Sequence, residues 1–194
     1  MRVRSFTKTD ILGCPSGAGT LPESCEPGWT QMQKKCYKLE TTAFGKNWDT
    51  ASANCQAKGA KLASIETSCE QETVAALATK EVWIGGSDQP EEGTWKWPSG
   101  TEFYKSKAPV SGVYTNLDTA FENIGQDNQD CVQIKTDGKW DDIVCTTFKD
   151  YICEKAAYAG GNTYVAPSTV APTTQSKCIQ LWSKYKENVF RVYK

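Results

Sequence analysis

Two stretches of the chain place apolar residues at the spacing of an α-helix. In residues 47–59, apolar positions recur three and four residues apart, and Gly59 stands where a helix C-terminal cap is expected. In residues 67–80, Thr67 and Glu70 have the spacing of a capping box ahead of an apolar run. The pattern therefore predicts two helices in the first half of the chain.

Beyond residue 80, apolar residues come in short runs that are typical of strands. The runs are VWIGG (82–86), TWKW (94–97), CVQIKT (131–136), KWDDIVC (139–145) and YICEK (151–155). We expect Trp83, Trp95 and Trp97 within them to fill core space, as aromatic side chains in strands usually do. Two helices followed by short strands and long connections predict an α+β fold.

Composition divides the chain into four segments. Residues 1–24 are rich in Gly, Pro and Ser and form a lead-in, whereas residues 25–155 carry most of the periodic apolar positions and form the globular domain. Residues 156–177 read as a Thr/Pro-rich linker, and residues 178–194 as a basic, aromatic tail. The tail can form an amphipathic helix, so we hypothesise a homo-oligomer joined through residues 178–194; the alternative is an unstructured tail.

Charge and residue types argue against nucleic-acid binding and against catalysis. The chain has 22 basic and 23 acidic residues, so no strong field attracts a polyanion. It contains no histidine, which removes the commonest general base. The adjacent carboxylates of Asp141 and Asp142 would point to opposite faces of a strand, with no nucleophile beside them. We therefore expect a protein that is not an enzyme.

The chain holds nine cysteines without the paired C-x-x-C spacing of zinc sites. A disulfide framework is the better interpretation, and it predicts a secreted or extracellular protein. No stretch reaches the roughly 18 apolar residues of a membrane span, so no such span is expected.

Seven motifs, met in order along about 130 residues, resemble the long form of the C-type lectin-like domain. They are CEPGWTQMQKKCYKL (25–39), WDTASANCQAKGAKLASI (48–65), WIGG (83–86), GTWKWPSG (93–100), CVQI (131–134), KWDDIVC (139–145) and YICE (151–154). The resemblance implies an α+β fold of two helices, small antiparallel sheets and a long loop region. It also implies three disulfides, which are Cys25–Cys36, Cys55–Cys153 and Cys131–Cys145. A further bridge from Cys69 to Cys14 or to Cys178 stays open.

The same resemblance implies a calcium site. Sugar-binding members hold calcium between a loop motif, Glu-Pro-Asn or Gln-Pro-Asp, and a strand motif, Trp-Asn-Asp. Trp140, Asp141 and Asp142 match the strand motif, with an oxygen ligand kept where aspartate replaces asparagine. Gln126 and Asp127 match the loop motif without its proline. In the family that proline is cis; a cis bond between Gln126 and Asp127 would cost about 3 kcal/mol, so we expect a trans loop.

Electrostatics supports a cation independently. A Cys131–Cys145 bridge would bring Asp130 near Asp142, and several close carboxylates repel one another unless a cation intervenes. The alternative is an ordinary solvated acidic loop. The predicted metal ligands are Gln126, Asp127, Asp130, Asp141 and Asp142, and the predicted carbohydrate-binding residues are Gln126, Asp127, Asp141 and Asp142.

Residues 101–120 form an insertion, because relatives need only a handful of residues there. Its apolar content predicts some ordered structure, beside the predicted calcium loops, where it either reshapes the ligand surface or is a tolerated surface insertion. Two functions stay open, and the insertion and the loop without its proline favour the second. One is a calcium-dependent lectin that binds glycans, with Gln-then-Asp order resembling galactose-binding members. The other is a module that binds an extracellular protein, a mineral surface or ice without sugar.

Overall fold

The computed structural model describes residues 24–122 and 128–158. The strands and helices of this part, in chain order, are β1 (Thr30–Met32), β2 (Lys35–Glu40), α2 (Trp48–Gln56), β3 (Lys61–Leu62), α3 (Ser68–Leu77), β4 (Val82–Ser87), β5 (Thr94–Lys96), β6 (Glu102–Lys105), β7 (Ala108–Pro109), β8 (Cys131–Ile134), β9 (Trp140–Ile143) and β10 (Asp150–Ala156). The predicted α+β fold is confirmed. The lead-in up to residue 23, the linker beyond residue 158 and the tail lie outside the described residues.

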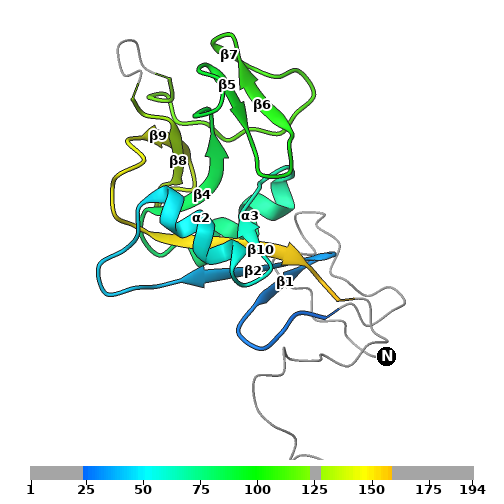
Figure 1. Ribbon diagram of the computed structural model, residues 1–194. Coiled ribbons are helices and arrows are strands. Elements are labelled where there is room, and N and C mark those ends of the chain that lie inside the picture. Colours follow the sequence, from blue (N-terminus) through cyan, green and yellow to red (C-terminus); the bar gives the residue numbers. More distant parts are fainter. Residues whose placement is uncertain (1–23, 123–127, 159–194) are drawn as a thin grey trace, which may run out of the picture. The chain divides into compact units, whose positions relative to one another are not determined.

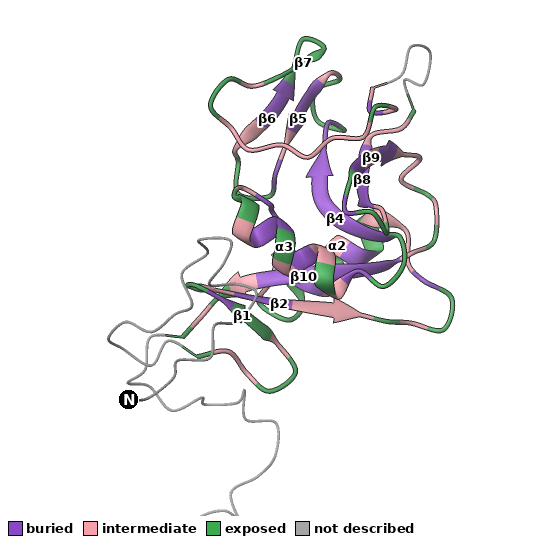
Figure 2. Ribbon diagram, turned by 180° about the vertical axis from the view of Figure 1, so that it is seen from behind, coloured by how far each residue is buried: buried purple, intermediate pink, exposed green. Residues whose placement is uncertain are grey.

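The strands follow the order β1-β2-β10-β4-β5-β6-β7, with β3 attached to β10, and β8 and β9 attached through β4. Most neighbours are antiparallel, but β10 and β4 pair in parallel, with Tyr151 opposite Trp83. In Figure 1, β1, β2 and β10 lie beside both helices, and β5 to β9 form the opposite end. Every residue of β4 is buried (Figure 2), so this strand forms the centre on which the two ends are built.

Helix α2 begins and ends where its sequence predicts. The Asn47 side chain accepts a hydrogen bond from the Thr50 N–H at 2.9 Å, which caps the N-terminus. At the other end the Ala60 N–H donates to the Cys55 carbonyl and the Gly59 N–H to the Gln56 carbonyl, at 3.0 and 2.9 Å. This is the Schellman hydrogen-bond pattern, and it requires the positive φ of +65° that Gly59 adopts.

Helix α3 differs from its predicted cap in one detail. The Thr67 hydroxyl accepts from the Glu70 N–H at 3.2 Å, as a capping box requires. The Glu70 carboxylate, however, accepts from the N–H of Glu66 at 2.7 Å and not from that of Thr67. It also pairs with Lys35 at 2.6 Å, so the cap joins the helix to β2.

Aromatic side chains fill the larger of two core clusters. Trp97 stacks on Phe103 at 4.4 Å between ring centres and meets Trp140 edge-on at 5.0 Å. Trp95 and Trp83 are no more than 1% exposed. The prediction that the strand tryptophans fill the core is therefore confirmed.

Three disulfides occur among the described residues: Cys25–Cys36, Cys55–Cys153 and Cys131–Cys145. These are the pairs that the resemblance implied. The Cys55–Cys153 bridge spans 98 residues, and closing so long a loop stabilises the fold by about 4–5 kcal/mol in the chain-entropy picture. Cys69 is disulfide-bonded too, and the cysteines that the sequence offers it, Cys14 and Cys178, lie outside the described residues.

The 101–120 insertion is an integral part of the domain. It contributes β6 and β7, and its later residues pack against the aromatic core. Tyr114 meets Trp140 edge-on at 5.9 Å, and the Trp140 N–H donates to the Asn116 carbonyl at 3.0 Å. The expected ordered structure is confirmed, and the insertion leads directly to Phe121 and Glu122. None of the helices in the described part is both long and apolar enough to cross a membrane.

Candidate metal site

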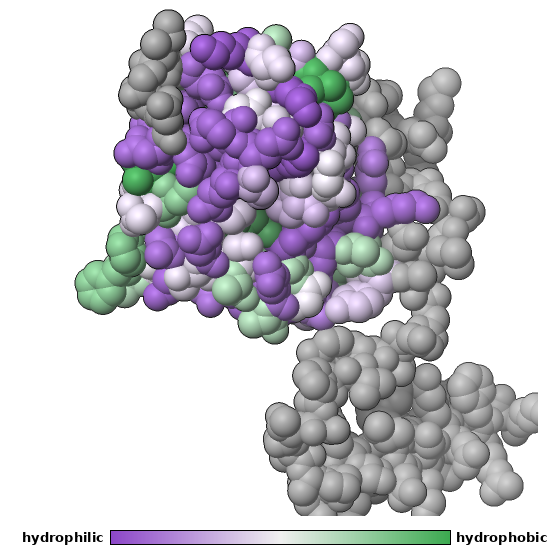
Figure 3. All heavy atoms as spheres, turned by 45° about the horizontal axis from the view of Figure 1, so that its top comes forward, coloured by the Kyte–Doolittle hydropathy of each residue, from purple (hydrophilic) through white to green (hydrophobic). Residues whose placement is uncertain are grey.

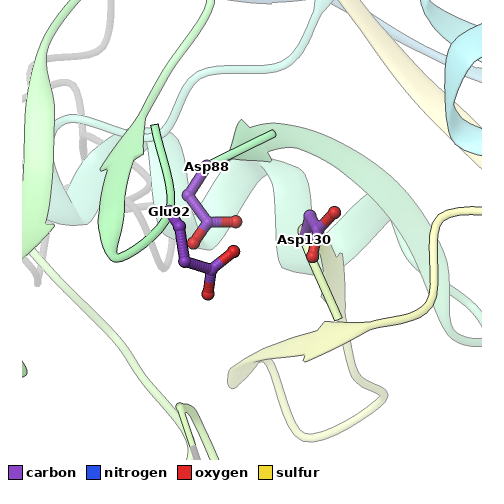
Figure 4. A group of neighbouring side chains, drawn as sticks. All are labelled: Asp88, Glu92 and Asp130. Atoms are coloured by element: carbon purple, nitrogen blue, oxygen red, sulfur yellow. The ribbon is translucent and has the colours of Figure 1, made fainter. Parts of the chain in front are cut away.

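Three carboxylates converge at one end of the central sheet. Asp88 directly follows β4, Glu92 lies in the turn after it, and Asp130 immediately precedes β8. One oxygen from each lies within 4.8 Å of the other two, and Figure 4 shows the three groups facing a common space. The antiparallel pairing of β4 with β8, which sets Ser87 opposite Cys131, brings Asp88 and Asp130 together. We call Asp88, Glu92 and Asp130 the acidic trio.

Asp88 is the most constrained member of the acidic trio. It is only 1% exposed, and its Oδ2 accepts a hydrogen bond from the Gly93 N–H at 2.8 Å. Its Oδ1 is buried without a hydrogen-bond partner. A buried, unpaired carboxylate oxygen is costly, so this atom is a ready ligand for a cation.

The electrostatics of the acidic trio point the same way. Burial, together with the charges of Glu92, Asp130 and Glu122, raises the pKa of Asp88 to about 7, against the lowering effect of the Gly93 N–H. Burial also raises the pKa of Asp130. The folded chain therefore resists carrying all these negative charges at once, and a divalent cation would relieve that repulsion.

Asp141 and Asp142 diverge, as adjacent residues on a strand must. Asp142 is buried, and its Oδ1 accepts from the Glu122 N–H at 2.9 Å. Burial raises its pKa to about 6. Asp141 is half-buried and accepts from the Gln133 side chain at 3.1 Å, and burial raises its pKa as well.

Glu122 connects the acidic trio with Asp142. Its backbone has a φ of +58°, in the left-handed region that favours glycine. Its carboxylate accepts a hydrogen bond from the Trp95 indole N–H, while its own N–H donates to Asp142. The Glu122 charge raises the pKa of both Asp88 and Asp142, so it lies within electrostatic reach of both.

The structure groups the predicted ligands differently from the sequence-based expectation. Asp130 shares its space with Asp88 and Glu92, whereas the Asp142 carboxylate is engaged by Glu122. Gln126 and Asp127 lie outside the described residues. Of the two lysines nearest in sequence, Lys135 pairs with Asp118 at 3.0 Å, and its charge also opposes the rise in the pKa of Asp141. Lys139 donates to Asn116 at 2.8 Å.

Sequence reasoning missed Asp88, Glu92 and Glu122. A usable signal exists for the first two: SDQPEEG (87–93) places three carboxylates around a proline–glycine turn directly after a buried strand. No local pattern marks Glu122, because its position depends on Trp95 and Asp142, which are distant in sequence.

The acidic trio fits a hard divalent cation. Calcium takes six to eight oxygen ligands and accepts irregular arrangements of carboxylates. Three carboxylates, one with an orphaned buried oxygen, supply part of such a shell. The end of the domain at the top of Figure 1, which comes forward in Figure 3, presents mostly hydrophilic residues, so a charged or hydroxyl-bearing ligand could approach it.

Comparisons with known proteins reveal relatives of two kinds. The chain is 37% identical over 136 residues to the type-2 ice-structuring protein of Brachyopsis segaliensis. The matched region covers 69% of this chain and 73% of that protein. The solved structure of a calcium-independent type II antifreeze protein matches 73% of this chain and 99% of its own, with 34% identity and a TM-score of 0.59.

Carbohydrate-recognition domains are the second kind of relative. The cow C-type carbohydrate-recognition domain of CD23, solved in the presence of an oligosaccharide, matches 70% of this chain and 98% of its own. Its TM-score is 0.61 and its identity 26%. The family model described as the lectin C-type domain matches residues 44–155. The chain therefore belongs to the C-type lectin family, whose members are binding proteins and not enzymes.

Proposed function

We propose that this domain is an extracellular, calcium-dependent lectin that binds glycans. The observation that carries the proposal is the acidic trio, in which Asp88 leaves a buried oxygen unpaired. The disulfides are consistent with an oxidising, extracellular setting. A bound calcium ion would supply charge neutralisation and open coordination positions, and Asp88, Glu92 and Asp130 would hold it.

Sugar binding is assigned to the residues that match the family's loop and strand motifs, which are Gln126, Asp127, Asp141 and Asp142. The support from the described residues is the position of Asp142. Its carboxylate lies within electrostatic reach of Glu122, which in turn lies within reach of Asp88. Cation binding at the acidic trio would therefore be felt at the proposed sugar site. Gln-then-Asp order favours a galactose-type ligand.

Two measurements test the proposal. Isothermal titration calorimetry of the full chain with calcium measures the cation site, and Asp88→Asn should remove the heat of binding. Retention on immobilised galactose and mannose, in calcium and then in EDTA, measures the sugar site. Elution by EDTA supports the proposal, and flow-through from both resins in calcium contradicts it.

A second candidate function is ice binding, which the ice-structuring and antifreeze relatives favour. The acidic trio does not separate the two functions, because the similar type II antifreeze structures include one described as calcium-independent and one described as Ca2+-dependent. Thermal hysteresis of the full chain separates the two functions. Freezing-point depression without retention on either sugar resin would make ice the ligand.

A further inference from the structure

Two phenylalanine side chains stand in solvent on loops that take no part in the acidic trio. Phe44, between β2 and α2, is 88% exposed, and Phe148, between β9 and β10, is 65% exposed. They are the most exposed large hydrophobic residues among those described. Exposed apolar side chains that gather at one place, and are not scattered singly, mark a binding surface, and both rings line the same pocket.

The loops that carry these rings are tied to each other. The Lys46 N–H donates to the Lys149 carbonyl at 2.8 Å, and the Lys149 N–H returns the bond to Lys46 at 3.0 Å. Gly45 has a φ of +72°, and a Cβ atom there would lie 2.6 Å from the Lys149 nitrogen. The backbones therefore meet too closely for any side chain at Gly45, and the two rings are displayed from a fixed platform.

Between the rings lies an open pocket of about 570 Å³. Its size suits a small-molecule ligand, which typically occupies a few hundred Å³ or more. Phe44 and Phe148 are its large apolar lining residues, and Lys80, Glu81 and Thr136 are among its polar ones.

The charges around the pocket balance. Lys80 pairs with the buried carboxylate of Asp150 at 2.8 Å, and Lys149 pairs with Glu81 at 3.0 Å. A charged ligand of either sign would therefore be repelled by a group of its own charge that lies beside each group of opposite charge. A wholly apolar ligand would desolvate these charges without offering hydrogen bonds. The pocket therefore suits a neutral ligand that combines an apolar face with hydroxyl groups.

A sugar ring has this combination of surfaces. We propose that the pocket bounded by Phe44 and Phe148 is a glycan-binding subsite that works without calcium. The C–H face of a neutral sugar stacks on the electron-rich ring faces, and its hydroxyls donate to Glu81 and accept from Lys80 and Thr136. The subsite uses no residue of the acidic trio, so it adds to the calcium-dependent function and does not rest on it.

The test uses the full chain and sensor surfaces carrying neutral glycans that end in galactose, mannose or N-acetylglucosamine. Binding is measured in calcium and in EDTA. Wild type should still bind at least one of these glycans in EDTA, and we call this binding the EDTA-resistant component. In a variant with Phe44→Ser and Phe148→Ser, the affinity of this EDTA-resistant binding should fall at least tenfold. Tyr158→Ser, which removes an aromatic residue 46% exposed at the far end of β10, is the matched control and should bind as wild type does. Melting curves establish that all variants fold.

Two results would overturn the subsite. One is the loss of all binding in EDTA across the glycan panel, and the other is an EDTA-resistant component that the phenylalanine substitutions leave unchanged. Sedimentation of wild type and the double variant adds a third arm. Self-association that the substitutions abolish, without EDTA-resistant glycan binding, would reassign the surface to a second copy of the chain. Asp88→Asn should leave the EDTA-resistant component intact, so failure of the calcium proposal is distinguishable from failure of the subsite.

Discussion

The backbone N–H of Asp88 donates a hydrogen bond to the backbone carbonyl of Asp130 over 3.3 Å. Their side chains thus meet because β4 and β8 pair, and the pairing holds two like charges together at the end of a buried strand. A fold that fixes carboxylates in this way makes their charge state part of its stability.

Calcium should therefore stabilise the folded chain. We expect millimolar calcium to raise the melting temperature by about 3–8 °C relative to EDTA, through linkage of binding to folding. Asp88→Asn should remove most of this shift, because it eliminates the charge on the most buried ligand. Differential scanning calorimetry measures both.

Glu91→Gln is the matched control for the calcium experiment. Glu91 lies in the same turn as Glu92, but its 57% exposed carboxylate pairs with lysines outside the acidic trio. This variant should keep the calcium-dependent shift. Superimposed curves of wild type in calcium and in EDTA would rule out a cation site that stabilises the fold.

Stability without calcium should depend on pH through Asp88. Its pKa in the folded chain, about 7, lies above the ordinary value of 3.8, so the folded state holds this proton more tightly than the unfolded state does. The resulting stabilisation is complete below about pH 4 and is lost as the pH rises to 7. Asp142, with a pKa of about 6, acts in the same direction over a narrower range.

The difference between wild type and Asp88→Asn isolates this effect from other titrating groups. In EDTA, the melting temperature of wild type should fall relative to the variant between pH 4 and pH 7, and calcium should cancel that fall. A parallel pH dependence of the two proteins would show that Asp88 does not titrate in this range.

Sequence periodicity was sufficient for both helices and for β4, β5, β8, β9 and β10, because their signals are local, whereas β1, β2, β3, β6 and β7 were not among the predicted strands. Gly59 ends α2 by a conformation that glycine favours, and the buried tryptophans mark the strands. The acidic trio could not be predicted in the same way. It depends on the register of β4 against β8, which joins residues more than forty positions apart.

The different surroundings of Asp130 and Asp142 could not be predicted for a similar reason, because they too depend on residues that are distant in sequence. The sequence places both beside the Cys131–Cys145 bridge, but the ordered insertion gives the Asp142 carboxylate a partner of its own. Residues 101–120 lead to Glu122, whose backbone N–H donates a hydrogen bond to the Asp142 carboxylate. An insertion that packs on the core can thus reassign a neighbouring side chain, and no motif in the insertion reveals it.

Trp140 and Gln71 join β9 to α3, and their pair should be measurable as a coupling energy. The Trp140 indole N–H donates to Gln71 Oε1 at 2.7 Å, and both groups are buried. Trp140→Phe leaves that oxygen unpaired and should cost about 2–4 kcal/mol, including the lost aromatic contacts. Adding Gln71→Met should cost less than the sum of the two single changes, since both polar partners are then gone. Urea denaturation of the four proteins measures this; additive effects would show that the bond contributes nothing.

The odd number of cysteines bears on whether residues 178–194 join two chains. Nine cysteines are present, the described bridges use six, and Cys69 is also disulfide-bonded. Of Cys14 and Cys178, one is therefore left over if the other pairs with Cys69. We expect Cys178 to be the residual thiol and to link two chains, because it begins an apolar, basic segment that can associate as a helix. Non-reducing gels should show a dimer that Cys178→Ser abolishes and Cys14→Ser does not. A dimer lost only with Cys14→Ser would place the link at the other end of the chain, and a monomer throughout would exclude covalent pairing as the route to multivalent binding.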